Sequence, residues 1–200
     1  GLGGYIKTIV SSGRIAYTGS SAQTIRRIKD NTANALLITN TSSEGATLIG
    51  NDNSFGDLNT FNSVSIAANS ILNVEAGDKL TVNNSLTNEG TFRLLSNSDG
   101  TATLLTHGSI TTNQGTYKVQ QYLTGSNNGS TPNGRFWYVS SPLTGALSAT
   151  FNPASGLNKL WSWDEPTHSY ISIPNNTDLL TVGKGYVARM GNTGTVEFSS

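Results

Sequence analysis

One stretch of this sequence occurs twice with small changes, and we call it the repeated phrase. SLTNEGTFRL at residues 85–94 returns as SITTNQGTYKV at residues 109–119. From Asn88 to Leu94 the two copies match at six positions, shifted by about 25 residues, which is a usual length for stacked repeat units. Repeats of β-forming residues punctuated by Gly and Asn favour a parallel β-helix, in which each coil lays its strands on those of the previous coil.

Short apolar clusters separated by polar turns extend this pattern towards the N-terminus. The clusters lie at residues 5–10, 14–17, 23–29, 36–38, 47–49, 61–66, 71–74 and 80–82. Their alternation predicts short strands, with Gly or Asn supplying positive φ at the corners. The side chains expected inside the column are Val64, Ile66, Leu72, Val74, Leu80, Val82, Leu86, Phe92, Leu94, Leu104 and Ile110. Asn88 stacked over Asn113 is the expected hydrogen-bonded ladder.

The residue pattern of the sequence changes after a polar tract at residues 124–134. Strand patterns follow at 135–139, 159–163, 169–173, 185–189 and 195–198. They predict an antiparallel β-sandwich-like domain at residues 135–200, which we expect to continue beyond Ser200. The predicted fold class is therefore all-β: a short right-handed parallel β-helix over residues 1–123, a linker or long loop at 124–134, and the sandwich-like domain.

Composition removes several classes of function. Charged residues make up 12% of the chain, the formal net charge is zero and there is no cysteine. Nucleic-acid binding normally needs a basic surface, and Arg26, Arg27 and Lys29, the most basic spot, are better explained as a solvated rim than as an anion site. No apolar run reaches the roughly 20 residues of a membrane helix. No nucleic acid and no membrane insertion are therefore expected.

The sequence resembles the modular secreted and cell-surface proteins of Bacteroidetes-type bacteria, many of which are substrates of the type IX secretion system. The matching stretches are residues 80–105, 109–123, 135–142, 160–173 and 180–198, and residues 19–25 resemble the start of a coil. Gln121 stands where these proteins usually have a basic residue. The resemblance implies a secreted or outer-surface location on a Gram-negative bacterium and contact with the secretion machinery, but no shared catalytic motif.

Aromatic residues are the strongest candidates for a binding site. Trp161, Trp163, Tyr170 and Trp137, together with Tyr138, are able to form a platform that stacks on the apolar face of a pyranose ring. The same residues also suit the core of a sandwich. Both interpretations remain open from the sequence.

Catalytic and metal sites have weaker support. Asp164, Glu165 and His168 lie within five residues, but Pro166 favours a hairpin turn, and no pair of carboxylates has glycosidase spacing. Residues 51–57 and 97–99 offer oxygen ligands for Ca²⁺ without matching a calcium motif. We therefore expect no enzyme activity, no catalytic residue, no metal site and no cofactor, with Ca²⁺ as a weak alternative.

The leading functional hypothesis is a non-catalytic structural or adhesive segment of an exported bacterial surface protein. The alternative is a carbohydrate-binding or polysaccharide-processing module that uses the aromatic cluster. The expected partners are an extracellular glycan or a host or cell-surface protein.

Overall fold

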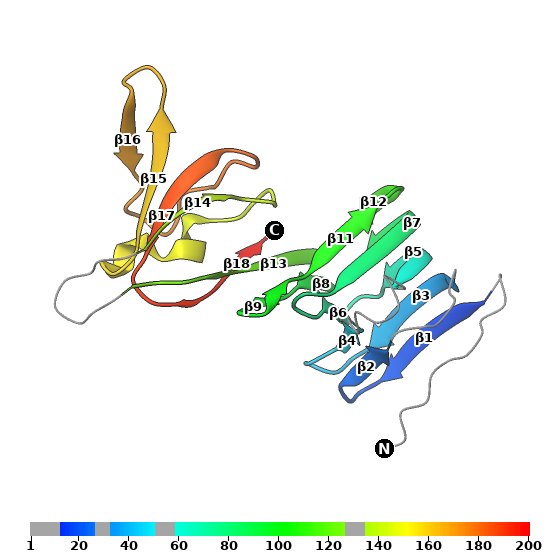
Figure 1. Ribbon diagram of the computed structural model, residues 1–200. Helices are drawn as coiled ribbons and strands as arrows, with labels where there is room; N and C mark the ends of the chain where they lie inside the picture. Colours follow the sequence, from blue (N-terminus) through cyan, green and yellow to red (C-terminus); the bar gives the residue numbers. More distant parts are fainter. Residues whose placement is uncertain (1–12, 27–32, 51–58, 127–134) are drawn as a thin grey trace. The chain divides into compact units, whose positions relative to one another are not determined.

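The computed structural model describes residues 13–26, 33–50, 59–126 and 135–200, and these form an all-β chain (Figure 1). The chain divides into two compact units, residues 1–117 and residues 118–200. Residues 118–123, which the sequence placed in the repeat region, therefore group with the second unit. The predicted strand at residues 5–10 and most of the predicted linker lie outside the described residues.

The first unit is a β-solenoid of about four turns. Its strands are β1 (Arg14–Gly19), β2 (Gln23–Arg26), β3 (Ala33–Asn40), β4 (Ala46–Ile49), β5 (Thr60–Ile66), β6 (Ile71–Val74), β7 (Lys79–Asn88), β8 (Thr91–Leu94), β9 (Ser96–Asn97), β10 (Gly100–Thr101), β11 (Thr103–Thr106) and β12 (Ser109–Thr112). Strands β1, β3, β5 and β7 pair in parallel, and β11 and β12 both pair along β7. Strands β2, β4, β6 and β8 form the second parallel sheet. The predicted parallel stacking is confirmed, and the handedness of the coils stays a prediction.

Apolar side chains stack in register between the two sheets. Leu36 lies opposite Val64, and Val64 opposite Leu86, so equivalent positions of successive coils form one row. The core consists of Ile25, Leu36, Ile38, Ala46, Leu48, Phe61, Val64, Ile66, Leu72, Val74, Leu80, Val82, Leu86, Phe92 and Ala102. Complete burial of one such large side chain stabilises a fold by about 1.5–3 kcal/mol. This column is the main source of stability in the unit.

The predicted inward positions are confirmed except for Ile110, and two of them lie at the margin of the core. Leu94 and Leu104 are only partly buried against the core. Ile110 was expected inside the column, but it is 48% exposed. It lies on β12, which pairs with β7 alone among the described strands, so no later coil covers it.

The predicted Asn88–Asn113 ladder is wrong. Thr112, not Asn113, lies opposite Asn88 in the strand register, because the second copy of the repeated phrase contains one more residue than the first. Asn88 is fully buried, whereas Asn113 is exposed. The Asn88 amide instead accepts from the Gly90 N–H (3.1 Å) and donates to the Thr116 carbonyl (3.0 Å). One buried side chain thus links two successive coils.

The two glycines of the repeated phrase are required by close packing. A Cβ on Gly90 would meet the carbonyl oxygens of Ser70 and Ala67, and a Cβ on Gly115 would meet that of Asn88. Neither glycine has positive φ; near these turns positive φ occurs at Asn69 and Gln114. The expectation that these corners need glycine for its φ is therefore replaced by close backbone approach.

The second unit contains two groups of antiparallel strands. Its elements are β13 (Thr116–Leu123), which begins in the last residues of the first unit, β14 (Arg135–Ser140), the 3₁₀ helices η1 (Ser148–Phe151) and η2 (Pro153–Ser155), β15 (Lys159–Asp164), β16 (Ser169–Ser172), β17 (Gly185–Met190) and β18 (Gly194–Ser199). Strands β14, β17, β15 and β16, in that order, form a four-stranded antiparallel sheet, and β18 pairs with β13. The five predicted strands are confirmed, and their assembly into a sandwich stays a prediction.

Alternation along the four-stranded sheet gives it one buried face. Val139, Leu160 and Ala188 join the core of the second unit. Leu123, Val196 and Phe198, from β13 and β18, belong to the same core. The residues between these buried positions must point to the other face of the sheet, because successive strand residues alternate. Among the described residues, no helix is long and apolar enough to cross a membrane.

Candidate functional site

The open face of the four-stranded sheet carries a group of aromatic side chains. Phe136 and Tyr138 come from β14, Trp161 and Trp163 from β15, and Tyr170 from β16. Phe136 is 62% exposed and Tyr138 85%, while Trp163 and Tyr170 are 40% and 51% exposed. We call this surface the aromatic face. Exposed apolar groups of this size on one surface are uncommon unless they meet a partner.

Ring contacts join four residues of the aromatic face in two pairs. The Phe136 and Trp161 ring centroids lie 6.0 Å apart with an interplanar angle of 32°. Trp163 lies opposite Tyr170 in the strand register, and their rings meet edge-to-face at 5.0 Å and 69°. Such pairs are favourable beyond the area that they bury, and they hold each ring in a defined orientation. The sheet therefore presents fixed, flat apolar surfaces.

Two tyrosine hydroxyls add a polar group to this surface. Burial by neighbouring side chains raises the pKa of the Tyr170 phenol above its ordinary value, although half of the residue is exposed. A hydrogen bond with Tyr138 and the charge interaction between the two phenols raise this pKa further. The two side chains come from β14 and β16, the outer strands of the sheet. Their hydroxyls must therefore meet above the inner strands.

Two cationic residues flank the aromatic rings. Arg189 lies opposite both Phe136 and Lys159 in the strand register. Their neighbours in sequence, Leu160 and Ala188, are buried in the core, so Lys159 and Arg189 point to the aromatic face. Both are half-buried. The Arg189 Nε is shielded from solvent and has no hydrogen-bond acceptor among the described residues.

Trp137, also predicted from the sequence to join the platform, lies on the opposite face. It pairs with Ala188 in the register and packs against the core. Its indole Nε1 donates to the Thr124 carbonyl (2.8 Å), and the Arg135 guanidinium carbon lies 5.1 Å from its ring centroid. The reason is that successive side chains of β14 point to opposite faces of the sheet. Phe136 and Tyr138 therefore lie on the aromatic face and Trp137 on the core face.

The Asp164, Glu165 and His168 group forms a hairpin turn. Asp164 Oδ2 accepts hydrogen bonds from the Thr167 N–H and hydroxyl, and the His168 N–H donates to the Glu165 carbonyl (3.3 Å). Glu165 and His168 are exposed, and His168 has a positive φ of 49°. Local turn geometry accounts for these three residues. The geometry does not bring them together around a cleft.

The calcium candidates have no metal-like geometry where they are described. At residues 97–99, the Asn97 Oδ1 accepts from the Asp99 N–H (2.8 Å), an ordinary turn contact in the β9–β10 hairpin. No group of three or more His, Asp or Glu side chains able to hold a metal occurs in the described part of the chain. Residues 51–57 lie outside the described residues, as do Arg27 and Lys29; Arg26 is exposed on β2.

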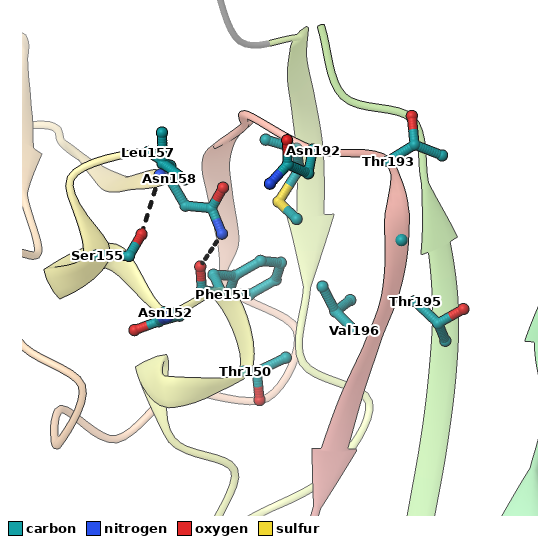
Figure 2. Close-up of a pocket in the computed structure, with 12 residues that line it drawn as sticks. Thr150, Phe151, Asn152, Ser155, Leu157, Asn158, Asn192, Thr193, Thr195 and Val196 are labelled. Carbon is teal, nitrogen blue, oxygen red and sulfur yellow. Dashed lines mark hydrogen bonds between the residues drawn. The ribbon is translucent and has the colours of Figure 1, made fainter. Parts of the chain in front are cut away.

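A hollow lies beside η1 and η2 (Figure 2). Its volume is about 280 Å³, and its lining consists of Thr150, Phe151, Asn152, Ser155, Leu157, Asn158, Met190, Asn192, Thr193, Gly194, Thr195 and Val196. The Asn158 amide donates to the Phe151 carbonyl (2.8 Å) and accepts from the Gly191 N–H (3.0 Å), so it fixes the loop. None of the lining residues is ionisable at neutral pH. The hollow therefore lacks an acid or base of its own.

Sequence reasoning found most of the aromatic face but missed three contributors. Phe136 was placed on a strand without a role, and Lys159 and Arg189 were not considered. The signal was available in spacing: Lys159 and Trp161 are two residues apart, as are Phe136 and Tyr138, and residues two apart on a strand share a face. The pairing of β17 between β14 and β15 was needed to add Arg189.

The described residues define an all-β protein with a β-solenoid and an antiparallel sheet that exposes aromatic side chains. The chain belongs to a family named as a domain of unknown function, DUF8693, whose model matches residues 28–200. No curated protein and no solved structure matches the chain.

Proposed function

We propose that this chain is a non-catalytic structural and adhesive segment of an exported bacterial surface protein. The solenoid serves as a scaffold, and the aromatic face of the second unit is the contact surface. The observation that carries the proposal is the exposure of four aromatic residues on one sheet face: Phe136, Tyr138, Trp163 and Tyr170. Phe136 contacts Trp161, and Trp163 contacts Tyr170. Export and the surface location rest on the resemblance to type IX secretion substrates.

The placement of the aromatic rings supports a rigid binding surface. Residues on the strands of a sheet are held more firmly than residues on loops, so little conformational entropy is lost when a ligand binds. Tyr and Trp also provide large contact areas with few rotatable bonds. We further infer that β13 and β18 form a second layer over the four-stranded sheet, as in a β-sandwich. The support for this inference is that both groups contribute to one core.

The second candidate function is carbohydrate binding, and a specific observation favours it. Flat aromatic rings cover the C–H-rich face of a pyranose, while hydroxyl groups hydrogen-bond to the sugar's edge. The aromatic face offers both, since the Trp163 ring contacts the Tyr170 ring and the Tyr170 hydroxyl hydrogen-bonds with that of Tyr138. In this form the adhesive partner is an extracellular glycan.

The test combines binding and degradation. The purified chain is applied to a glycan array and to immobilised host glycoproteins, and the same glycans are assayed for newly released reducing ends. We expect binding without degradation. Trp161→Ala and Trp163→Ala should lose binding, while circular dichroism shows that their fold is unchanged. Degradation that disappears in Asp164→Asn or Glu165→Gln would overturn the non-catalytic proposal.

Surface location is tested separately in the source bacterium. An antibody against the chain should label intact cells, and protease added outside the cells should remove the signal. Labelling only after permeabilisation would contradict export.

A further inference from the structure

We propose that the aromatic face binds acidic polysaccharides, whose sugar rings carry carboxylate or sulfate groups. This inference rests on the carbohydrate-binding form of the proposed function and names the class of glycan. It starts from the asymmetry of charge on the face, where cationic side chains lie beside the aromatic rings without acidic partners.

The cations form one end of the surface. Arg189 lies between Phe136 and Lys159 across three neighbouring strands, and Lys159 is two residues from Trp161 on β15. Adjacent strands are about 4.8 Å apart, so the two cations lie within reach of a single anionic group. A sugar ring stacked on Trp161 would place a ring substituent close to both.

The acidic residues of the second unit are engaged or placed elsewhere; Glu165 lies in the turn between β15 and β16, and Asp178 lies beside Ser148 of η1. Glu197 accepts from Lys118 (2.8 Å) and from Gln120 (3.0 Å). Asp164 follows Trp163 on β15, so it points to the opposite face, where it bonds with Thr167. In the described part of the chain, neither Lys159 nor Arg189 forms an ion pair. Two like charges held close together without a counter-ion favour an anionic ligand.

Arg189 also carries an unsatisfied donor. Its Nε is buried and lacks an acceptor in the part of the chain that the structure describes, and a buried donor without a partner lowers stability. Carboxylate and sulfate oxygens accept hydrogen bonds from guanidinium groups in pairs, with defined geometry. An acidic sugar therefore supplies the counter-charge that both cations lack, while a neutral sugar supplies only the stacking.

The experiment compares polymers with the same sugar backbone, with and without anionic groups. Affinities of the full chain are measured for polygalacturonate against its fully methyl-esterified form, and for dextran sulfate against dextran. We expect each acidic polymer to bind at least about tenfold more tightly than its neutral match, because one charge-assisted hydrogen bond contributes about that much to affinity. Added salt should weaken the binding of the acidic polymers. The two pairs distinguish carboxylate from sulfate as the preferred group.

Variants connect the preference to the two cations. Lys159→Gln and Arg189→Gln should each reduce binding of the acidic polymer about tenfold and leave the weak neutral binding unchanged. Arg189→Lys keeps the charge and loses the planar donor fork. It should bind the acidic polymer more tightly than Arg189→Gln does, but less tightly than the unmodified chain. Arg135→Gln is the matched control, because it removes the same charge from β14 on the opposite face, beside Trp137. It should bind within about twofold of the unmodified chain.

Each outcome has a defined meaning. Equal binding of the acidic and neutral polymers overturns this inference and leaves carbohydrate binding standing. Binding to none of the four polymers overturns both. Self-association of the chain that disappears in Trp161→Ala would identify the face as an interface between copies and would also overturn the inference. Thermal unfolding of every variant shows whether a loss of binding reflects a loss of fold.

Discussion

The two units place large aromatic side chains in opposite environments. In the solenoid, Phe61 and Phe92 are 1% exposed inside the column, whereas Phe136 and Tyr138 on β14 are 62% and 85% exposed. Both units use the same strand alternation, but the solenoid buries its inward residues between two sheets. The four-stranded sheet has its buried residues on one face only. Aromatic residues thus stabilise the core of the first unit, and the second unit uses them in both ways: Phe151 and Phe198 are buried in its core, while the residues of the aromatic face are available to a ligand.

The largest expected effect comes from replacing one aromatic residue in each unit. Phe92→Ala should reduce the free energy of unfolding by about 3–5 kcal/mol, because it leaves a cavity in the column. Phe136→Ala should change it by less than about 0.5 kcal/mol. Denaturant unfolding followed by far-UV circular dichroism measures both.

Tryptophan fluorescence provides the control, because all three Trp residues of the chain are in the second unit. In Phe92→Ala the circular dichroism transition should move further than the fluorescence transition. Equal losses in Phe92→Ala and Phe136→Ala would remove the contrast between the two units.

The next effect concerns the buried amide between coils. Asn88→Ala should destabilise the solenoid by about 1–3 kcal/mol, because the Gly90 N–H and the Thr116 carbonyl lose their partner. Asn113→Ala, at the matching position of the repeated phrase, should have almost no effect, since Asn113 is exposed. Chemical denaturation of both variants measures the difference, and an equal cost would mean that the two asparagines act alike.

A smaller effect is expected for the basic residue of the second copy. The Lys118 Nζ lies 2.8 Å from Glu197 Oε1, and both side chains are about one-third exposed. Lys118→Gln should therefore cost less than about 1 kcal/mol, and the cost should shrink further in concentrated salt. Thermal unfolding at low and high salt tests this, with Lys118→Arg as the control that keeps the charge. A cost that does not depend on salt would show that the ion pair is not its source.

The smallest effect is a change of stability with pH. The pKa of Tyr170 is raised above the value of 10.0 that a free tyrosine has. The unfolded chain therefore releases this proton first, so the stabilisation is fully present below pH 10.0 and is lost as pH rises through the higher folded pKa.

Tyr170→Phe should remove this part of the alkaline loss, as measured by denaturation at a series of alkaline pH values. In Tyr138→Phe the phenolate absorbance of Tyr170 should appear at lower pH, because one cause of the raised pKa is gone. An unchanged phenolate titration in Tyr138→Phe would mean that the two phenols are not coupled.

Alternation was sufficient to predict the strands of the solenoid and many of its buried residues, because Leu72, Val74 and Leu80 follow local patterns. It could not predict which strands are neighbours. β18 pairs with β13, which lies far away in the sequence, and local patterns carry no information on such pairing. The Asn113 prediction failed because a single additional residue shifts one strand register.

The aromatic face was predicted in part for a similar reason. Residues 136–139 are Phe, Trp, Tyr and Val, with no polar residue to show which alternate positions face the core. Tyr138 and Trp137 therefore looked equivalent. Only the packing of Val139 and Ala188 in the core separates them. Whether the face binds a glycan is not encoded in any local motif and depends on the assembled sheet.

The steps between stacked residues of the solenoid are unequal. Ile15 lies opposite Leu36, 21 residues on, while the next step to Val64 spans 28 residues and the one after it, to Leu86, spans 22. Most of the length differences fall between strands. The exception is the β5–β7 pair, where β7 has one more residue than β5 between the pairs Phe61–Val82 and Ser63–Ser85, and Val82 and Leu86 on either side of this bulge are still buried. Insertions at corners should therefore leave the column intact, whereas one added residue inside a strand, where no bulge absorbs it, would turn every later side chain of that strand to the wrong face. A scaffold of this kind accepts new loops without redesign of its interior.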